Sequence, residues 1–134
     1  PESGAEGLRL EGNPTLLGEM VRNLVDNALN YTPSTPARPG VVTVRLRGDH
    51  FARTLSLQVE DNGPGIPEAE RAQVLRPFYR TLGTQVDGSG LGLPIALEIA
   101  RQHRARLVIG DAHPGEEPPG ALFSVEFDAS APSA

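Results

Sequence analysis

Apolar residues recur every three or four positions between residues 14 and 31, and this spacing predicts a helix with one buried face. Asn13 and Pro14 are typical of the N-cap and the first position of a helix, and Thr32-Pro33 predicts where the helix ends. The predicted buried face consists of Leu16, Leu17, Met20, Val21, Leu24, Val25 and Ala28.

Alternation of apolar and polar residues predicts the strands. Residues 41–47 and 55–60 alternate like the two strands of a hairpin, and Gly48 and Asp49 begin the predicted connection. The other predicted strands are residues 8–11, 106–110 and 121–127.

Two shorter helical stretches are predicted at residues 68–75 and 93–103, the second with Pro94 in its first turn, where proline is tolerated. Residues 80–92 are rich in glycine and hydroxyl side chains and lack periodicity, so we expect them to be mobile. Strands interspersed with separate helices predict an α+β sandwich built on one mixed sheet.

The 134 residues are expected to form one domain, residues 1–134, with tails at 1–7 and 128–134 that fray. Apolar residues make up 38% of the chain and charged residues 22%, which is typical of a folded domain. Because the chain begins at Pro1 rather than at methionine, we expect it to be a fragment of a longer protein.

Charge and cysteine content exclude several functions. The formal net charge of −5 argues against a nucleic-acid partner. The absence of cysteine excludes disulfides, thiolate metal sites and a cysteine nucleophile. No apolar run approaches the ~18 residues of a membrane span, and the amino terminus lacks the features of a signal peptide.

Asn23 and Asn27 are four residues apart and therefore share one face of the predicted helix. Two carboxamides on an inward face of a helix need hydrogen-bond partners, because leaving a buried amide without one costs free energy. They could cap a neighbouring loop, or they could supply oxygen ligands to Mg²⁺.

Two glycine-rich segments are the other candidates for chemistry. Asp61 follows a predicted strand and opens the segment 61–67, which is either a plain turn or a site where the carboxylate accepts a hydrogen bond from an exocyclic amine such as that of adenine. Residues 88–93 run into a helix, where backbone N–H groups could bind phosphate. This second pattern also fits a flexible linker, and it is neither a GxGxxG nor a Walker sequence.

The order of these segments makes the combination specific. The chain resembles the ATP-binding catalytic domain of bacterial sensor histidine kinases over residues 8–127. The resemblance rests on four boxes in order, at Glu19 with 23–28, 61–66, 76–80 and 88–93. It implies a Bergerat-type fold, in which a layer of helices covers one face of a mixed sheet and ATP lies between the long helix and a flexible lid.

The resemblance also implies roles for individual residues. Asn27 would ligate Mg²⁺, Asn23 would contact the phosphate and metal region, and Asp61 would hold the adenine amino group. The remaining expected nucleotide contacts are Tyr31 beside the adenosine, Gly63, Gly65 and Ile66 around the base, Arg80 facing the phosphates, and Gly88, Ser89, Gly90, Leu91 and Gly92 as phosphate donors. Phe78 is expected to pack at the base of the lid.

The chain departs from the family pattern at two positions in particular. Asn30 stands where many members have a lysine or arginine that reaches the phosphates, so Arg80, Mg²⁺ and the backbone must supply more of the positive charge. Arg104 stands where a glycine often follows the last histidine of the helix. Either a left-handed cap forms there at a cost of about 1 kcal/mol, or the helix ends differently.

By resemblance, the domain binds Mg-ATP and donates the γ-phosphoryl group to a histidine that lies elsewhere. His50, His103 and His113 lack the sequence context of that acceptor and are expected to be surface residues. The implied partners are a dimerisation and histidine-phosphotransfer domain of the same parent and the receiver domain of a response regulator. The fragment is expected to be a monomer, and its parent a homodimer anchored in the bacterial inner membrane with this domain on the cytoplasmic side.

Two alternatives remain. The first is an ATPase of the gyrase, mismatch-repair or heat-shock chaperone kind, or an anti-sigma-factor serine kinase. These proteins carry a glutamate base at the position of Asn23, and an amide cannot accept a proton from water or serine. The second is a docking module that keeps the fold but has lost ATP, against which Asn27, Asp61 and the glycines of 88–92 argue.

Overall fold

The computed structural model describes residues 12–32, 35–37, 39–76 and 92–128. The predicted strand at 8–11, the tail at 1–7 and the segment 80–91 lie outside these residues. The elements are helix α1 (Pro14–Tyr31), strands β1 (Val42–Asp49) and β2 (Thr54–Asp61), 3-10 turns η1 (Glu68–Glu70) and η2 (Gln73–Leu75), helix α2 (Gly92–Gln102), and strands β3 (Arg106–Asp111) and β4 (Ala121–Asp128).

Most predicted elements are confirmed, with three local corrections. Residues 68–75 form two separate 3-10 turns rather than one helical stretch. Gly48 and Asp49 belong to β1, since they pair with Leu55 and Thr54, so the hairpin turn begins after them. Asp128, which was assigned to a tail, is the last residue of β4.

The four described strands form one sheet in the order β1-β2-β4-β3, and every neighbouring pair is antiparallel. The α+β sandwich is therefore confirmed, but the sheet is not mixed over these four strands. After α2 the chain re-enters the sheet as β3, which runs parallel to β2, as a connection through a helix allows. However, β4 lies between those two strands and pairs antiparallel with both.

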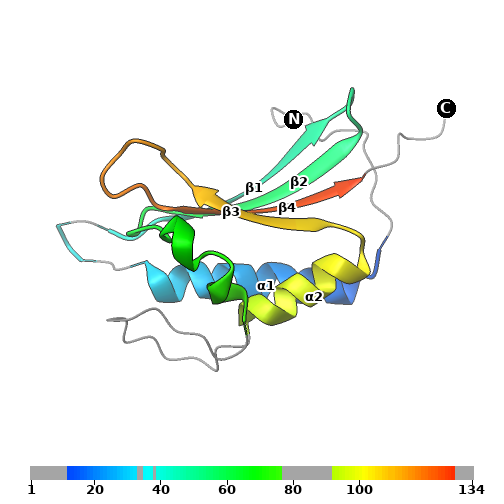
Figure 1. Ribbon diagram of the computed structural model, residues 1–134, viewed down its shortest axis with the longest axis horizontal. Helices are drawn as coiled ribbons and strands as arrows, with labels where there is room; N and C mark the ends of the chain where they lie inside the picture. The colour runs from blue at the N-terminus through cyan, green and yellow to red at the C-terminus, as the bar shows by residue number, and fades with distance from the viewer. Residues whose placement is uncertain (1–11, 33–34, 38, 77–91, 129–134) are drawn as a thin grey trace.

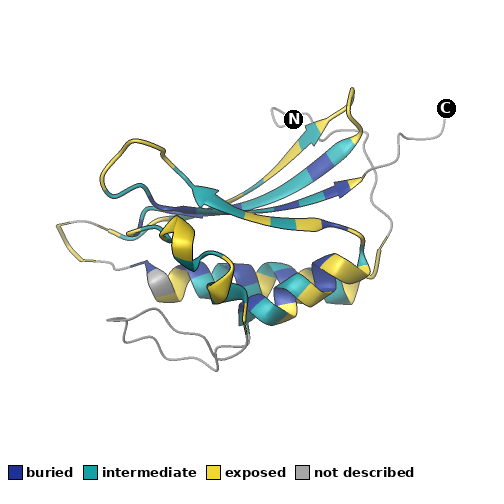
Figure 2. Cartoon of the chain, in the orientation of Figure 1, coloured by how far each residue is buried: buried dark blue, intermediate teal, exposed yellow. Residues whose placement is uncertain are grey.

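Both helices lie side by side against one face of the sheet (Figure 1). Figure 2 shows that the buried residues gather between the helices and the sheet. The largest fully buried side chains are Phe123, Met20, Leu24, Val59 and Val125. In the part of the chain that the structure describes, the helices cover one face of the sheet. The other face carries ion pairs, among them Arg106 with Glu126 at 2.7 Å and Arg45 with Glu60. In the described residues, neither helix is long and apolar enough to cross a bilayer.

Asn13, the residue that precedes α1, connects the two helices. Asn13 caps α1 as predicted, because its Oδ1 accepts the N–H groups of Thr15 and Leu16 at 3.0 and 3.1 Å. The backbone N–H of Asn13 donates to Nε2 of His103 at 3.0 Å, just beyond α2. Since Nε2 accepts, Nδ1 carries the proton and donates to the carbonyl of Ile99 at 2.8 Å. His103 is thus half-buried, and each of its ring nitrogens makes a hydrogen bond. It is therefore not the simple surface residue that the sequence predicted.

Of the two helix endings left open by the sequence, the structure has the left-handed cap, with Arg104 at a φ of 57°. The N–H of Arg104 donates to the carbonyl of Arg101 at 3.0 Å, and the N–H of Ala105 donates to the carbonyl of Ala100 at 2.8 Å. This pair of hydrogen bonds usually closes a helix on glycine. An arginine there stores about 1 kcal/mol of backbone strain.

Candidate functional site

Asp61 ends β2 as a buried carboxylate, with only 5% of the residue exposed. Its Oδ1 accepts two backbone N–H groups, from Gly63 at 2.9 Å and from Ala121 at 3.1 Å. Burial raises the pKa of Asp61, the two backbone hydrogen bonds lower it in part, and the charge of Glu60 raises it. Among the described residues, the hydrogen bonds of Asp61 all reach Oδ1, and a buried acceptor with its second oxygen available can recognise a ligand that donates a hydrogen bond.

The turn after Asp61 packs directly on the loop that leads into β4. Gly120 donates its N–H to the carbonyl of Gly63 at 3.0 Å. A Cβ on Gly120, whose φ is +69°, would lie 2.1 Å from the carbonyl oxygen of Asp61. Gly65, with φ of +80°, packs against the same place, where its Cβ would lie 3.0 Å from the carbonyl oxygen of Gly120. Glycine at both positions permits this close approach.

The end of the turn is held by Arg71. Its Nε donates to the carbonyl of Ile66 at 3.0 Å, and its Nη2 donates to Oδ1 of Asp111, also at 3.0 Å. Asp111 is the last residue of β3 and pairs with Ala121 in the sheet. Arg71 therefore joins the end of the turn to the Asp111–Ala121 pair of the sheet. Ala121 of this pair is also the residue that donates to Asp61.

Asn62 connects the turn to the segment that follows α1. Its Oδ1 accepts the N–H of Val41 at 2.9 Å, and its Nδ2 donates to the carbonyl of Pro39 at 3.0 Å. The side chain thus acts within the protein as a link between two loops. The roles of Asn62, Arg71, Gly120 and Ala121 were not predicted from the sequence. The local signals were that Asn62 lies in the segment 61–67 and that Gly120 directly precedes a predicted strand.

Asn23 lies where the two helices meet. Its Nδ2 donates to the carbonyl of Glu19 at 3.0 Å, one turn earlier in the same helix. A Cβ on Gly92, the first residue of α2, would lie 3.4 Å from Asn23 Oδ1. Asn27 is half-buried one turn further along α1. The amino terminus of α2, with its partial positive charge, therefore borders the asparagine face of α1.

The structure thus places the predicted residues in two groups. Gly92 meets Asn23 where α2 begins, and Asp61, Gly63, Gly65 and Ile66 share the turn after β2. Tyr31 ends α1, and only its backbone is described. The predicted contacts Arg80, Gly88, Ser89, Gly90 and Leu91 lie outside the described residues.

The available donors limit what kind of metal could bind. Within the described ranges, no three His, Cys, Asp or Glu side chains come together as a metal cage. Asn27 offers one amide oxygen. Mg²⁺ commonly takes only one or two protein ligands and completes its shell with water and phosphate. The donor set therefore fits magnesium that arrives with a phosphate ligand, and does not fit a stand-alone metal site.

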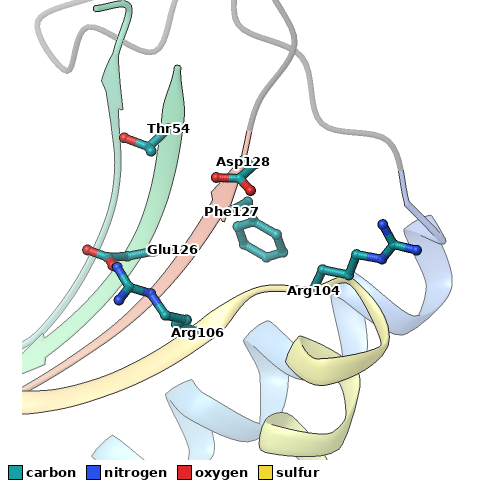
Figure 3. A pocket seen from close by; sticks show the side chains of 6 residues that line it. All are labelled: Thr54, Arg104, Arg106, Glu126, Phe127 and Asp128. Carbon is teal, nitrogen blue, oxygen red and sulfur yellow. The ribbon is translucent and has the colours of Figure 1, made fainter. Parts of the chain in front are cut away.

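A hollow of about 250 Å³ lies at the opposite end of the sheet (Figure 3). Its lining residues are Thr54, Arg104, Arg106, Glu126, Phe127 and Asp128. Thr54 begins β2 and Asp128 ends β4, whereas Asp61 and Ala121 lie at the other ends of these strands. The hollow is therefore separate from the predicted site.

A family model described as histidine kinase-, DNA gyrase B- and HSP90-like ATPase matches residues 12–131. The chain belongs to this family. Two curated relatives are similar to it: the sensor protein QseC of Escherichia coli O157:H7, 40% identical over 110 residues, and the signal transduction histidine-protein kinase/phosphatase MprB of Mycobacterium sp. strain KMS, 41% identical over 120 residues. The matches cover 82% and 89% of this chain, but only 22% of each relative.

Solved structures of this ATPase family agree with the fold. A mycobacterial sensor histidine kinase MprB superposes with a TM-score of 0.81 at 32% identity, covering 92% of this chain and 79% of that chain. Full-length ShkA in complex with AMPPNP gives a TM-score of 0.69 at 26% identity, covering 89% of this chain and 22% of that chain. The predicted resemblance to the ATP-binding catalytic domain of sensor histidine kinases is confirmed.

We expect Gly120→Ala to destabilise the domain far more than a matched glycine change. The new Cβ would force Asp61 and Gly120 apart and break the hydrogen bond from Ala121, with a loss of roughly 3 kcal/mol in the free energy of unfolding. Gly115→Ala is the control, because Gly115 also has a left-handed φ, +84°, but has open space around it. Urea denaturation should separate the two variants, and equal losses would contradict the packing role of Gly120.

We expect Asp61→Asn to leave the empty domain folded and to stabilise it at neutral pH. Asparagine Oδ1 can accept both backbone N–H groups without burying a charge. Because folding raises the pKa of Asp61, its contribution to stability is fully present below the ordinary value of 3.8 and is lost as pH rises through the raised value. The advantage of the variant should therefore shrink on acidification.

Denaturation over a pH series measures this difference. The exposed Asp128 provides the control, since Asp128→Asn removes a carboxylate that is not buried and should change stability little. A variant at position 61 that is less stable than the wild-type chain at neutral pH would refute the argument.

Proposed function

We propose that this chain is the ATP-binding catalytic domain of a sensor histidine kinase, and that it donates the γ-phosphoryl group of Mg-ATP to a histidine on a separate domain. The observation that carries the proposal is the buried carboxylate of Asp61, fixed by two backbone donors in a family of ATPases. The chain spans about a fifth of its curated relatives, so the activity and partners of the whole protein are part of the proposal.

Adenine recognition is assigned to Asp61. Both backbone donors bind Oδ1, which leaves Oδ2 as the acceptor for the exocyclic amine of adenine. A donated hydrogen bond favours the ionised carboxylate, so the ligand offsets part of the cost of burying it. Guanine presents a carbonyl oxygen at the corresponding position and would be repelled. Gly63, Gly65 and Ile66 give the surrounding turn its shape.

Phosphate binding is assigned to the junction of the helices. Helix α2 begins beside Asn23, and the amino terminus of a helix favours the binding of anions. Arg80 and the backbone of residues 88–91 are the further donors we expect. Asn27 would hold Mg²⁺, which when bound would neutralise charge on the phosphate oxygens. Asn30 brings no positive charge to this region.

The proposed acceptor is a histidine because Asn23 cannot act as a general base for water or serine. This disfavours the gyrase-like and chaperone-like alternatives. His103 has both ring nitrogens engaged, by Asn13 and by Ile99, and is no candidate for the acceptor. The proposed partners are therefore a dimerisation domain of the same parent and the receiver domain of a response regulator, and the proposed location is the cytoplasmic side of a membrane-anchored homodimer.

Calorimetry with AMP-PNP and Mg²⁺ tests the proposal on the 134-residue chain. The wild-type chain should bind, and Asp61→Asn should weaken binding by about 10-fold to 100-fold, because the amide N–H₂ faces the adenine amine. Asp128→Asn should bind like the wild-type chain. Failure of the wild-type chain to bind would reject the proposed function, and unchanged binding by Asp61→Asn would reject the assignment of the base site.

Asn27→Ala should distinguish metal-dependent binding of the phosphates from binding of the adenine base. We expect it to abolish the Mg²⁺-dependent part of AMP-PNP binding and, with ATP as the donor, phosphoryl transfer to an added acceptor domain, because the one protein oxygen assigned to the metal is removed. Adenosine, which has no phosphate and needs no metal, should bind as before. Calorimetry with both ligands makes the comparison, and loss of adenosine binding would show that Asn27 acts on the fold rather than on magnesium.

A further inference from the structure

Arg71 links the segment beyond Ile66 to the sheet through its side chain. η1 and η2 are three-residue turns with no fully buried residue, and Val74 and Leu75 of η2 pack against the core as partly buried side chains. Arg71 lies between them and donates to Ile66 on one side and to Asp111 on the other. We propose that Arg71 is a positioning residue for adenine recognition, which rests on the function proposed above.

The geometry explains how Arg71 acts on the base site without contacting the base. Asp111 and Ala121 are partners across β3 and β4. Ala121 donates to Asp61 at the start of the turn, and Asp111 accepts from Arg71 at its end. The turn is therefore fixed at both ends to one rung of the sheet. Release of either end changes where Asp61 and Ile66 lie relative to each other.

Arginine suits this position for a stereochemical reason. Its Nε and Nη2 point to different acceptors at the same time, each at 3.0 Å. Lysine has one ammonium group on a flexible stem and cannot reproduce this fork. The side chains of Arg71 and Asp111 are only 25% and 36% exposed, so water competes less with the pair than with a surface pair.

The same strand offers a matched comparison. Arg106 and Glu126 form an ion pair at 2.7 Å, with side chains 79% and 38% exposed, at the other end of β3. That pair also involves one arginine and one carboxylate. It joins two strands and holds no turn, so its loss should leave nucleotide binding unchanged.

The experiment measures AMP-PNP and GMP-PNP affinity, each with Mg²⁺, for the wild-type chain and four variants. Arg71→Lys breaks the fork but keeps the positive charge, and Arg71→Met breaks the fork and removes the charge. Asp111→Asn keeps an acceptor but removes the negative charge, and Arg106→Met is the control. For the two Arg71 variants we expect AMP-PNP affinity to fall about tenfold. The preference for AMP-PNP over GMP-PNP should fall by the same factor, and Asp111→Asn should fall less.

The outcomes are distinguishable. Reduced preference for adenine in folded Arg71 variants, with an unchanged Arg106→Met, supports the positioning role. Unchanged preference in folded Arg71→Lys overturns it, and so does an equal loss in Arg106→Met, which would reveal a general effect of destabilising the sheet. A wild-type chain that binds neither analogue rejects the proposed function itself, and thermal denaturation shows which variants are folded.

Discussion

The burial of the Asp61 carboxylate constrains the structure around it. A charged group in the interior needs fixed hydrogen-bond donors, and Asp61 obtains one from a residue two positions away and another from a residue 60 positions away. The end of β2 must therefore meet the start of β4, and Gly120 must lack a side chain so that the two backbones can approach. The order of strands in the sheet follows the same requirement, since β4 has to lie beside β2.

The site divides into a part built on the sheet and a part built between helices. The turn after Asp61 is held by hydrogen bonds to the loop before β4 and by the Arg71 bridge to β3. The asparagine face of α1 meets the first residue of α2. The proposed base site thus relies on the sheet and its loops, whereas the region proposed for phosphate and metal relies on the packing of two helices. Substitutions in one part should therefore leave the other largely intact.

Features that depend on neighbouring residues could be predicted from the sequence. Asn13 and Pro14 located the start of α1, and the position of Asp61 after a strand located the turn, because each signal is local. Contacts between distant residues could not be predicted. Asp61 meets Ala121 across 60 positions and Arg71 meets Asp111 across 40, and no periodicity encodes such pairs. The insertion of β4 between β2 and β3, which made the sheet antiparallel, escaped prediction for the same reason.

The hydrogen bond from Asn13 to His103 also has a mechanical consequence. It ties the start of α1 to the end of α2, while the contact of Asn23 with Gly92 joins the same two helices at the beginning of α2. Sliding one helix along the other would break the hydrogen bond at the end of α2 and disturb the close packing at its beginning. We therefore expect the two helices to move as a unit relative to the sheet.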